Sequence, residues 1–197
     1  AAILGLGFFI FSLINTTIAN MEAMALIALI SLSFSGALLG FLPFNFNPAK
    51  IFLGDAGSMF IGYFLSSMGI LMAHYAKIKN NDKWFFLLPV LLLSYAIFDT
   101  ALVSVTRKRD GRNIMQGGKD HSTHRIHTVL GSAKVTAVMI YLINIIIVLT
   151  TIVVFKIQSR QLLIITTGLF ALIFVVFGIK LDQVPIVIPH NQKKNTG

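Results

Sequence analysis

Two short polar segments of this 197-residue chain combine a carboxylate with groups that bind phosphate. The first segment, residues 44–58, carries Asp55 between Gly54 and Gly57. Mg²⁺ uses hard oxygen ligands of this kind together with water and substrate phosphates, and the glycines would let a ligand approach the backbone closely. On spacing alone a second interpretation stays open, in which Asp55 caps a helix and Lys50 is an ordinary interfacial cation.

The second segment, residues 106–132, is the longest polar stretch of the chain. Its basic and imidazole side chains are Arg107, Lys108, Arg109, Arg112, Lys119, His121, His124, Arg125 and His127. His121 and His124 would share one face of a helix, and Arg125 could offer a planar fork to phosphate. Zinc is not favoured, because only Asp120 and His127 lie nearby to complete its ligand set. Composition alone favours a basic juxtamembrane loop that attracts anionic lipid head groups.

A third candidate, Asp99, lies within an apolar stretch, about two helical turns from its end. An ionisable side chain inside a membrane span is functional by default. The alternative is a carboxylate that pairs with Lys or Arg of a neighbouring span, or one that is kept protonated.

The elements that must position these residues are apolar helices. The chain is 56% hydrophobic and only 12% charged, with a mean hydropathy of +0.83, which indicates an integral membrane protein. Continuous apolar runs favour helices over barrel strands, and small residues in the second run (Ser31, Ser33, Ser35 and Gly36) suit close helix packing. We therefore expect an all-α, polytopic membrane helix bundle with about six transmembrane helices, near residues 1–19, 23–42, 58–76, 84–105, 133–155 and 162–181.

The basic residues are distributed unevenly between the two sides of such a bundle. Eleven of the 16 Lys and Arg residues fall on the side of segments 43–57 and 106–132 and of the C-terminal tail, and five on the other. The positive-inside rule then predicts that both polar segments are cytoplasmic, and residues 182–197 are expected to form a mobile cytoplasmic tail. The net charge of +9 is explained by these loops, so we expect no nucleic-acid partner.

The first segment also carries a long sequence signature. Residues 45–58 fill every fixed position of Asn-x-x-Pro-Ala-x-x-Phe-x-Gly-Asp-x-Gly-Ser, and the run resembles that of the polyprenyl-phosphate N-acetylhexosamine-1-phosphate transferases of glycosyltransferase family 4. The resemblance implies that Asp55 binds the catalytic Mg²⁺, with Mn²⁺ as the alternative ion, and that Phe52 lies against the uracil ring. It also implies substrate binding by Asn45, Lys50 and Gly54.

The second segment is similar to the His-x-His-His-Arg loop of the same family. The resemblance implies that His121, His124 and Arg125 are catalytic groups that handle the diphosphate and the lipid phosphate, with Lys119 in substrate binding. Thr123 stands where the middle His is usual. This difference argues against the phospho-N-acetylmuramoyl-pentapeptide branch, which has three consecutive His, and favours the N-acetylglucosamine branch.

The family also has an Asp-Thr pair after a Pro. Asp99-Thr100 matches that pair, although Ala96 replaces the Pro. The resemblance therefore implies a supporting role for Asp99.

The family's two earlier aspartate motifs find no match in this sequence. We therefore expect residues 1–197 to be the C-terminal part of a single multi-span transferase domain, and expect this part to be inactive alone.

The activity implied by the resemblance is transfer of N-acetylglucosamine-1-phosphate from UDP-N-acetylglucosamine to undecaprenyl phosphate, with release of UMP. It would occur at the cytoplasmic face of the bacterial cytoplasmic membrane, among membrane lipid, during cell-wall or surface-polysaccharide synthesis; a homodimer is left open. The alternatives are a catalytically inactive paralogue that binds polyprenyl phosphate and a fragment of a secondary transporter, which would show midplane polar residues and inverted repeats.

Overall fold

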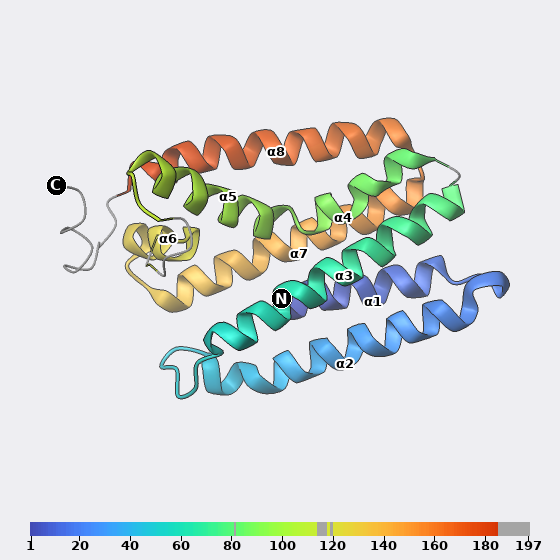
Figure 1. The fold of residues 1–197 in the computed structure, drawn as a ribbon, viewed down its shortest axis with the longest axis horizontal. Helices are drawn as coiled ribbons and strands as arrows, with labels where there is room; N and C mark the ends of the chain where they lie inside the picture. Colours follow the sequence, from blue (N-terminus) through green and yellow to red (C-terminus); the bar gives the residue numbers. More distant parts are fainter. Residues whose placement is uncertain (81, 114–117, 119, 185–197) are drawn as a thin grey trace. The chain divides into compact units, whose positions relative to one another are not determined.

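The protein is helical throughout the part of the chain that the structure describes. This computed structural model describes residues 1–80, 82–113, 118 and 120–184. Over these residues the elements are α1 (Ala2–Asn15), η1 (Ile18–Asn20), α2 (Met21–Asn45), α3 (Gly54–Asn80), η2 (Lys83–Phe86), α4 (Leu87–Leu92), α5 (Ser94–Arg109), α6 (Ser122–Leu130), α7 (Ala133–Ile157) and α8 (Arg160–Asp182). Figure 1 shows their course. The expected all-α class is confirmed.

Among the described residues, four helical segments are long and apolar enough to cross a membrane: Ile18–Asn45, Gly54–Ala76, Ala133–Ile157 and Arg160–Asp182. Lys83–Leu92 and Ser94–Arg109 qualify together as a fifth, broken span. The chain therefore has the helices of an integral membrane protein.

Over the described residues the structure has four or five candidate spans where about six were expected, and the first apolar stretch forms a shorter helix, α1. Helix α1 has 14 residues, about 21 Å of helix, whereas a hydrocarbon core is about 30 Å thick. The helix ends because Thr16 adopts an extended conformation (ψ 129°). The Asn20 side chain then accepts hydrogen bonds from the backbone N–H and the hydroxyl of Thr17, at 2.6 and 2.9 Å, and so fixes a separate turn before α2.

The chain divides into two compact units, which we describe separately. The first comprises Ala1–Leu93 and Asn144–Gly168, and the second comprises Ser94–Ile143 and Leu169–Gly197. The first polar segment belongs to the first unit and the second polar segment to the second unit. Helices α7 and α8 each contribute to both units.

In the first unit, α1 packs along α2 through small residues (Figure 1). A side chain at Gly5 would place its Cβ 2.3 Å from Ser35 Oγ, so the two helices touch only because Gly5 has none. Ser31 and Ser35 are fully buried, and the Ser35 hydroxyl donates to the Ser31 carbonyl at 2.8 Å. The expected close packing is confirmed for these two serines, whereas Ser33 and Gly36 are exposed.

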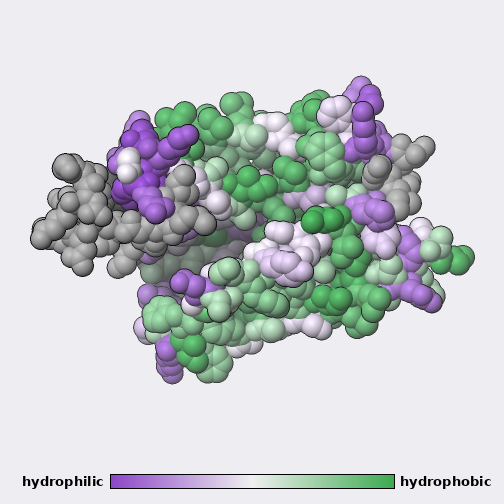
Figure 2. Space-filling model, in the orientation of Figure 1, coloured by the Kyte–Doolittle hydropathy of each residue, from purple (hydrophilic) through white to green (hydrophobic). Residues whose placement is uncertain are grey.

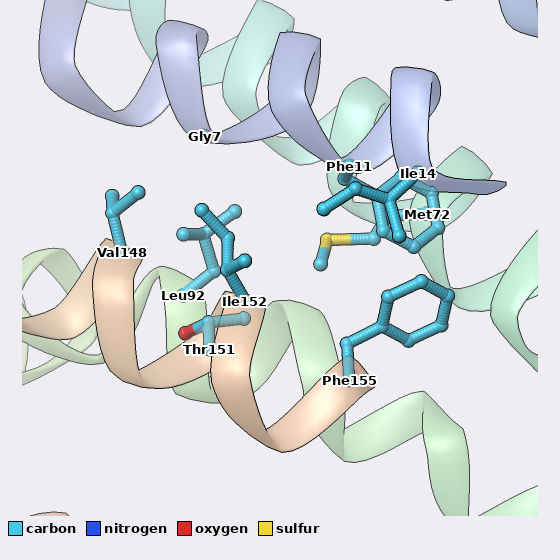
Figure 3. A pocket seen from close by; sticks show the side chains of 9 residues that line it. All are labelled: Gly7, Phe11, Ile14, Met72, Leu92, Val148, Thr151, Ile152 and Phe155. Carbon is cyan, nitrogen blue, oxygen red and sulfur yellow. The ribbon is translucent and has the colours of Figure 1, made fainter. Parts of the chain in front are cut away.

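The remaining core of the first unit is aromatic and aliphatic. Phe34 stacks on Phe64 with ring centroids 3.7 Å apart, and Phe11 lies 5.0 Å from Phe155. A small apolar cavity remains in this core, lined by side chains of α1, α3, α4 and α7 (Figure 3). Its one polar side chain, Thr151, donates its hydroxyl to the Ile147 carbonyl at 2.8 Å. The cavity is therefore apolar, and none of its lining side chains is a candidate functional group.

In the second unit, an aromatic cluster joins α5 to α8. The Phe98 and Phe174 rings stack with centroids 4.9 Å apart, and Phe177 lies 5.7 Å from Phe98. A Cβ at Gly178 would lie 3.2 Å from the Phe98 ring, so this glycine permits close contact. Helix α6 follows α5 and ends at Gly131, whose φ of +67° suits glycine.

The surface reflects the membrane character of the helices. Many large apolar side chains on α2, α3, α7 and α8 are exposed, which is expected of residues that face lipid. In Figure 2 polar side chains gather where α5 and α8 end. This end of the second unit carries the second polar segment.

Candidate functional site

The first polar segment is a tight loop that joins α2 to α3. The Asn45 side-chain amide donates to the Ile51 carbonyl at 3.0 Å, and the backbone N–H groups of Lys50 and Ile51 donate to the Phe44 carbonyl at 2.8 and 3.1 Å. Helix α2 includes Pro43 and continues to Asn45, so the loop begins after Asn45. The Asn45 amide therefore stabilises the loop.

Asp55 lies in the first turn of α3, at the end of this loop. The helix starts at Gly54, whose φ of +69° is a left-handed conformation that only glycine adopts without strain. At Gly57 an added Cβ would come within 2.7 Å of the Leu53 side chain. The Asp55 carboxylate is exposed, and within the described ranges no backbone N–H donates to it. This arrangement favours a ligand over a helix cap as the partner of the carboxylate.

One aromatic side chain of the loop, Phe52, is strongly exposed. Phe52 is 79% exposed, far more than a packed aromatic residue, and Lys50 beside it is exposed as well. An exposed ring can stack on a nucleobase, because every base has a π face. The position of Phe52 is therefore compatible with the uracil contact that the resemblance implies.

The loop offers a metal ion one carboxylate ligand, Asp55, rather than a complete set of protein ligands. Over the residues described, no group of three or more His, Asp or Glu side chains lies close enough to hold an ion. Mg²⁺ is often held by one or two carboxylates and completes its octahedral shell with water and substrate phosphates. Asp55 fits that role as a single protein ligand.

The second polar segment is organised around a buried carboxylate, Asp120. Arg107 donates to it through Nε at 2.7 Å and Nη2 at 2.6 Å, and Arg112 adds a bond at 3.1 Å. The Asp120 side chain is 1% exposed. Its hydrogen bonds with Arg107 lower its pKa to about 2, against the opposing effect of burial. Asp120 is therefore a buried anion that ties the end of α5 to the start of α6.

Arg125 is also buried, with a side chain only 2% exposed. Its Nε donates to the Asp120 carbonyl at 3.1 Å and its Nη1 to the Leu181 carbonyl at 2.9 Å. It thereby joins α6 to the last turn of α8. The Arg125 guanidinium thus already donates to two backbone carbonyls. Contact between Arg125 and substrate phosphate stays a prediction.

The imidazoles lie at the exposed side of α6. His121 precedes the helix and its Nδ1 lies 2.8 Å from Asp99 Oδ2, while His124 and His127 are exposed on the helix itself. The hydrogen bond with Asp99 raises the pKa of His121 above its ordinary value. The predicted pair of histidines is therefore accessible, and within the described part of the chain Asp99 pairs with an imidazole rather than with Lys or Arg. Lys119 lies outside the described residues, as does the tail from residue 185 onward.

The sequence did not reveal which basic residues are structural. The polar segment offers several arginines, and nothing in their spacing singles out Arg107 as the partner of Asp120 or Arg125 as a ligand of backbone carbonyls. Tyr95 was also missed, although its hydroxyl lies 2.9 Å from Ser122 Oγ. The partners in each case are distant in sequence, so a local pattern carries no signal for them.

Comparison with known proteins gives one family. The model of glycosyl transferase family 4 matches residues 2–73. A probable undecaprenyl-phosphate N-acetylglucosaminyl 1-phosphate transferase of Bacillus subtilis is 35% identical over 128 residues, which is 65% of this chain and 35% of the relative. The decaprenyl-phosphate N-acetylglucosaminephosphotransferase of Mycobacterium tuberculosis is 39% identical over 124 residues, 58% of this chain and 30% of the relative.

A relative from another branch also matches. The phospho-N-acetylmuramoyl-pentapeptide-transferase of Levilactobacillus brevis is 37% identical over 92 residues, 47% of this chain and 27% of the relative. The chain thus spans about a third of the length of the curated relatives it matches. No solved structure matches. The family model over residues 2–73 and these relatives show that the chain is similar to members of glycosyl transferase family 4.

Proposed function

We propose that the complete protein containing this chain transfers N-acetylglucosamine-1-phosphate from UDP-N-acetylglucosamine to undecaprenyl phosphate and releases UMP. The names of the Bacillus and Mycobacterium relatives support the amino sugar and a polyprenyl phosphate acceptor. Their identity to this chain extends over more residues than that of the pentapeptide transferase. Cell-wall or surface-polysaccharide synthesis is the process we assign to this product.

The observation that carries the proposal is the loop between α2 and α3 with Asp55 at its end. The loop is closed by backbone and Asn45 hydrogen bonds, and it presents an exposed aromatic ring and an exposed carboxylate within a few residues of each other. A uridine diphosphate needs both kinds of contact: a π surface for the base and a cation-binding carboxylate for the diphosphate.

The reaction is a phosphoryl transfer. An oxygen of the lipid phosphate attacks the phosphorus that bears the sugar, the bond from that phosphorus to the UMP oxygen breaks, and UMP leaves with the electron pair. The lipid phosphate is ionised at neutral pH, so no general base is required. Catalysis then depends on positioning and on neutralising the charge that develops on the phosphate oxygens.

We assign these tasks to residues of both polar segments. Asp55 would hold Mg²⁺, which would neutralise the diphosphate. Phe52 would orient the uracil, and Asn45, Lys50, Gly54 and Lys119 would contact the rest of the nucleotide sugar. His121 and His124, exposed beside α6, would meet phosphate oxygens, and Arg125 would support them from the buried side of that helix.

We also propose that both segments face the cytoplasm of a bacterium. The basic residues on their side of the membrane outnumber those on the other by eleven to five. A single Cys placed at Thr123, which is exposed, should resist impermeant thiol reagents in intact cells, and one at Asn80 should react. The reverse labelling pattern would place the site on the outer face.

The experiment that tests the proposal is Asp55→Asn in the complete protein. The assay is exchange of labelled UMP into UDP-N-acetylglucosamine in the presence of undecaprenyl phosphate. The substitution should abolish exchange and the Mg²⁺ dependence of UDP-sugar binding, because an amide is a poor substitute for a carboxylate as a ligand of a hard cation.

Glu22→Gln is the matched control, since Glu22 is an exposed carboxylate in the first turn of another apolar helix, α2. It should retain exchange. If Asp55→Asn retains most activity at ordinary Mg²⁺, the carboxylate is not the metal ligand. If the unmodified complete protein catalyses no exchange with any UDP-sugar but binds undecaprenyl phosphate, the inactive paralogue is the better reading.

A further inference from the structure

Over the described residues, the carboxylate of Asp99 has two hydrogen-bonding partners, and both lie at the start of α6. Its Oδ2 is 2.8 Å from His121 Nδ1, and its Oδ1 accepts the backbone N–H of Ser122 at 2.7 Å. The side chain is 22% exposed and projects from α5, more than 20 residues earlier in the chain. One carboxylate therefore fixes both an imidazole and a helix end that belong to a different element.

The bond to Ser122 caps α6 from outside the helix. Ser122 is the first helical residue, and its N–H has no partner within the helix. The preceding residue, His121, makes no capping bond with its own side chain. Asp99 supplies the acceptor instead, and its negative charge is favourable at a helix N-terminus. Tyr95, from the same helix as Asp99, adds a 2.9 Å hydrogen bond to the Ser122 hydroxyl.

The bond to His121 determines which ring nitrogen can meet a ligand. An ionised carboxylate only accepts hydrogen bonds, so Nδ1 must carry a proton. Nε2 is then the nitrogen on the opposite side of a ring that is 48% exposed. If the ring is neutral, Nε2 can only accept a hydrogen bond, which an anionic oxygen cannot donate. If the ring is protonated, Nε2 donates and brings a positive charge.

We propose that Asp99 is a positioning residue that holds His121 with Nε2–H directed at an anionic oxygen of the substrate phosphates. The proposal rests on the assigned phosphate-transfer function and adds to it the group that orients and charges the imidazole. The raised pKa of His121, caused chiefly by its hydrogen bond with Asp99, supports a ring that keeps its proton near neutral pH. Asp120 acts in the same direction and Arg107 opposes it.

The test separates capping from orientation with Asp99→Asn. The amide oxygen can still accept the Ser122 N–H, whereas the amide nitrogen donates to His121 Nδ1 and removes the negative partner. The matched control is Asp110→Asn, which removes one negative charge from the second polar segment, the segment that contains His121. Asp110 pairs with Arg109 and Arg112 instead of an imidazole. Each variant is made in the complete protein, and its unfolding midpoint is recorded.

Two measurements are made on each variant. Nitrogen NMR of labelled imidazoles, with His121 identified by its loss in His121→Gln, should show His121 titrating at lower pH in Asp99→Asn and unchanged in Asp110→Asn. UMP exchange should fall by roughly ten- to a hundred-fold or more in Asp99→Asn, by analogy with the loss when the carboxylate partner of a metal-ligating histidine is removed. The double variant with His121→Gln should be no slower than His121→Gln alone, because Asp99 acts through that ring.

An unchanged His121 titration in Asp99→Asn, or losses of exchange that multiply in the double variant, would overturn the proposal. Should Asp99→Asn fail to fold, Asp99→Glu provides the second variant: it keeps the charge beside the ring but displaces it by one methylene. That variant should retain the high titration pH and lose exchange, so exchange at the unmodified rate would also count against positioning. The NMR titration needs no turnover, and it therefore tests the pair even if the protein proves to have a different activity.

Discussion

Replacement of Asp120 by Asn should strongly destabilise the second unit. Asp120 is almost fully buried and takes two hydrogen bonds from Arg107, with a pKa of about 2 against an ordinary value of 3.8. A difference of nearly two pKa units corresponds to about 2.5 kcal/mol of stability at neutral pH. The Asn amide would also turn a donor toward a guanidinium that only donates, and breaking a buried ion pair costs about 3–5 kcal/mol in other proteins. We expect a loss of about 2–4 kcal/mol.

The assay is unfolding in a titration with denaturing detergent, followed by helical circular dichroism. Asp110→Asn is the control, because that side chain is 33% exposed and exposed pairs contribute about 0–1 kcal/mol. The contribution of Asp120 is present above its unfolded-state pKa and is lost as pH falls through the folded-state value. The gap between unmodified protein and Asp120→Asn should therefore close between about pH 4 and pH 2. Equal midpoints for the two variants at neutral pH, or a gap that persists at pH 2, would refute the reasoning.

Two further predictions concern the loop before α3 and the imidazole beside α6. Gly54→Ala should lower the free energy of unfolding by roughly 1–2 kcal/mol in the same detergent titration, because φ is +69° there and open space surrounds the added methyl group. Gly54→Asn should lower it less, because Asn tolerates the left-handed conformation. Equal losses would mean that the left-handed start of α3 is not required. UMP exchange should decline as pH rises through the elevated pKa of His121, which Asp99 and Asp120 raise and Arg107 lowers. The decline should begin at lower pH in Asp99→Asn, and identical alkaline profiles would show that the charge on His121 does not matter.

The long apolar runs predicted most of the fold. The helices α2, α3, α7 and α8 follow from continuous hydrophobicity over enough residues to span a bilayer. The helix of the first run ends at Asn15 rather than near residue 19, because Thr16 and the Asn20 turn interrupt it, and such a break depends on side-chain hydrogen bonds rather than on hydropathy. The break at Leu93 was not predicted either; it falls four residues after Pro89, at the end of a run of three leucines.

The candidate site was predicted in part. The sequence placed Asp55 next to a helix start, and the structure has it in the first turn of α3. It also placed His121 and His124 on one helical face, whereas His121 precedes α6 and only His124 lies on that helix. It did not predict that Arg125 is buried, because an arginine in a basic segment is ordinarily solvated. The cause of that burial is a carbonyl of α8, and its position depends on how three helices pack.

The bond from Arg125 to the Leu181 carbonyl has a consequence for biosynthesis. The two residues are 56 positions apart, so a ribosome that has just completed α6 must still translate most of two membrane helices before the acceptor exists. At typical bacterial elongation rates this interval is roughly 3–10 s. During that time the Arg125 guanidinium has the Asp120 carbonyl as an acceptor but lacks the Leu181 carbonyl. The histidine-bearing helix can therefore take its final position only after α8 has been made and inserted, late in the assembly of the protein in the membrane.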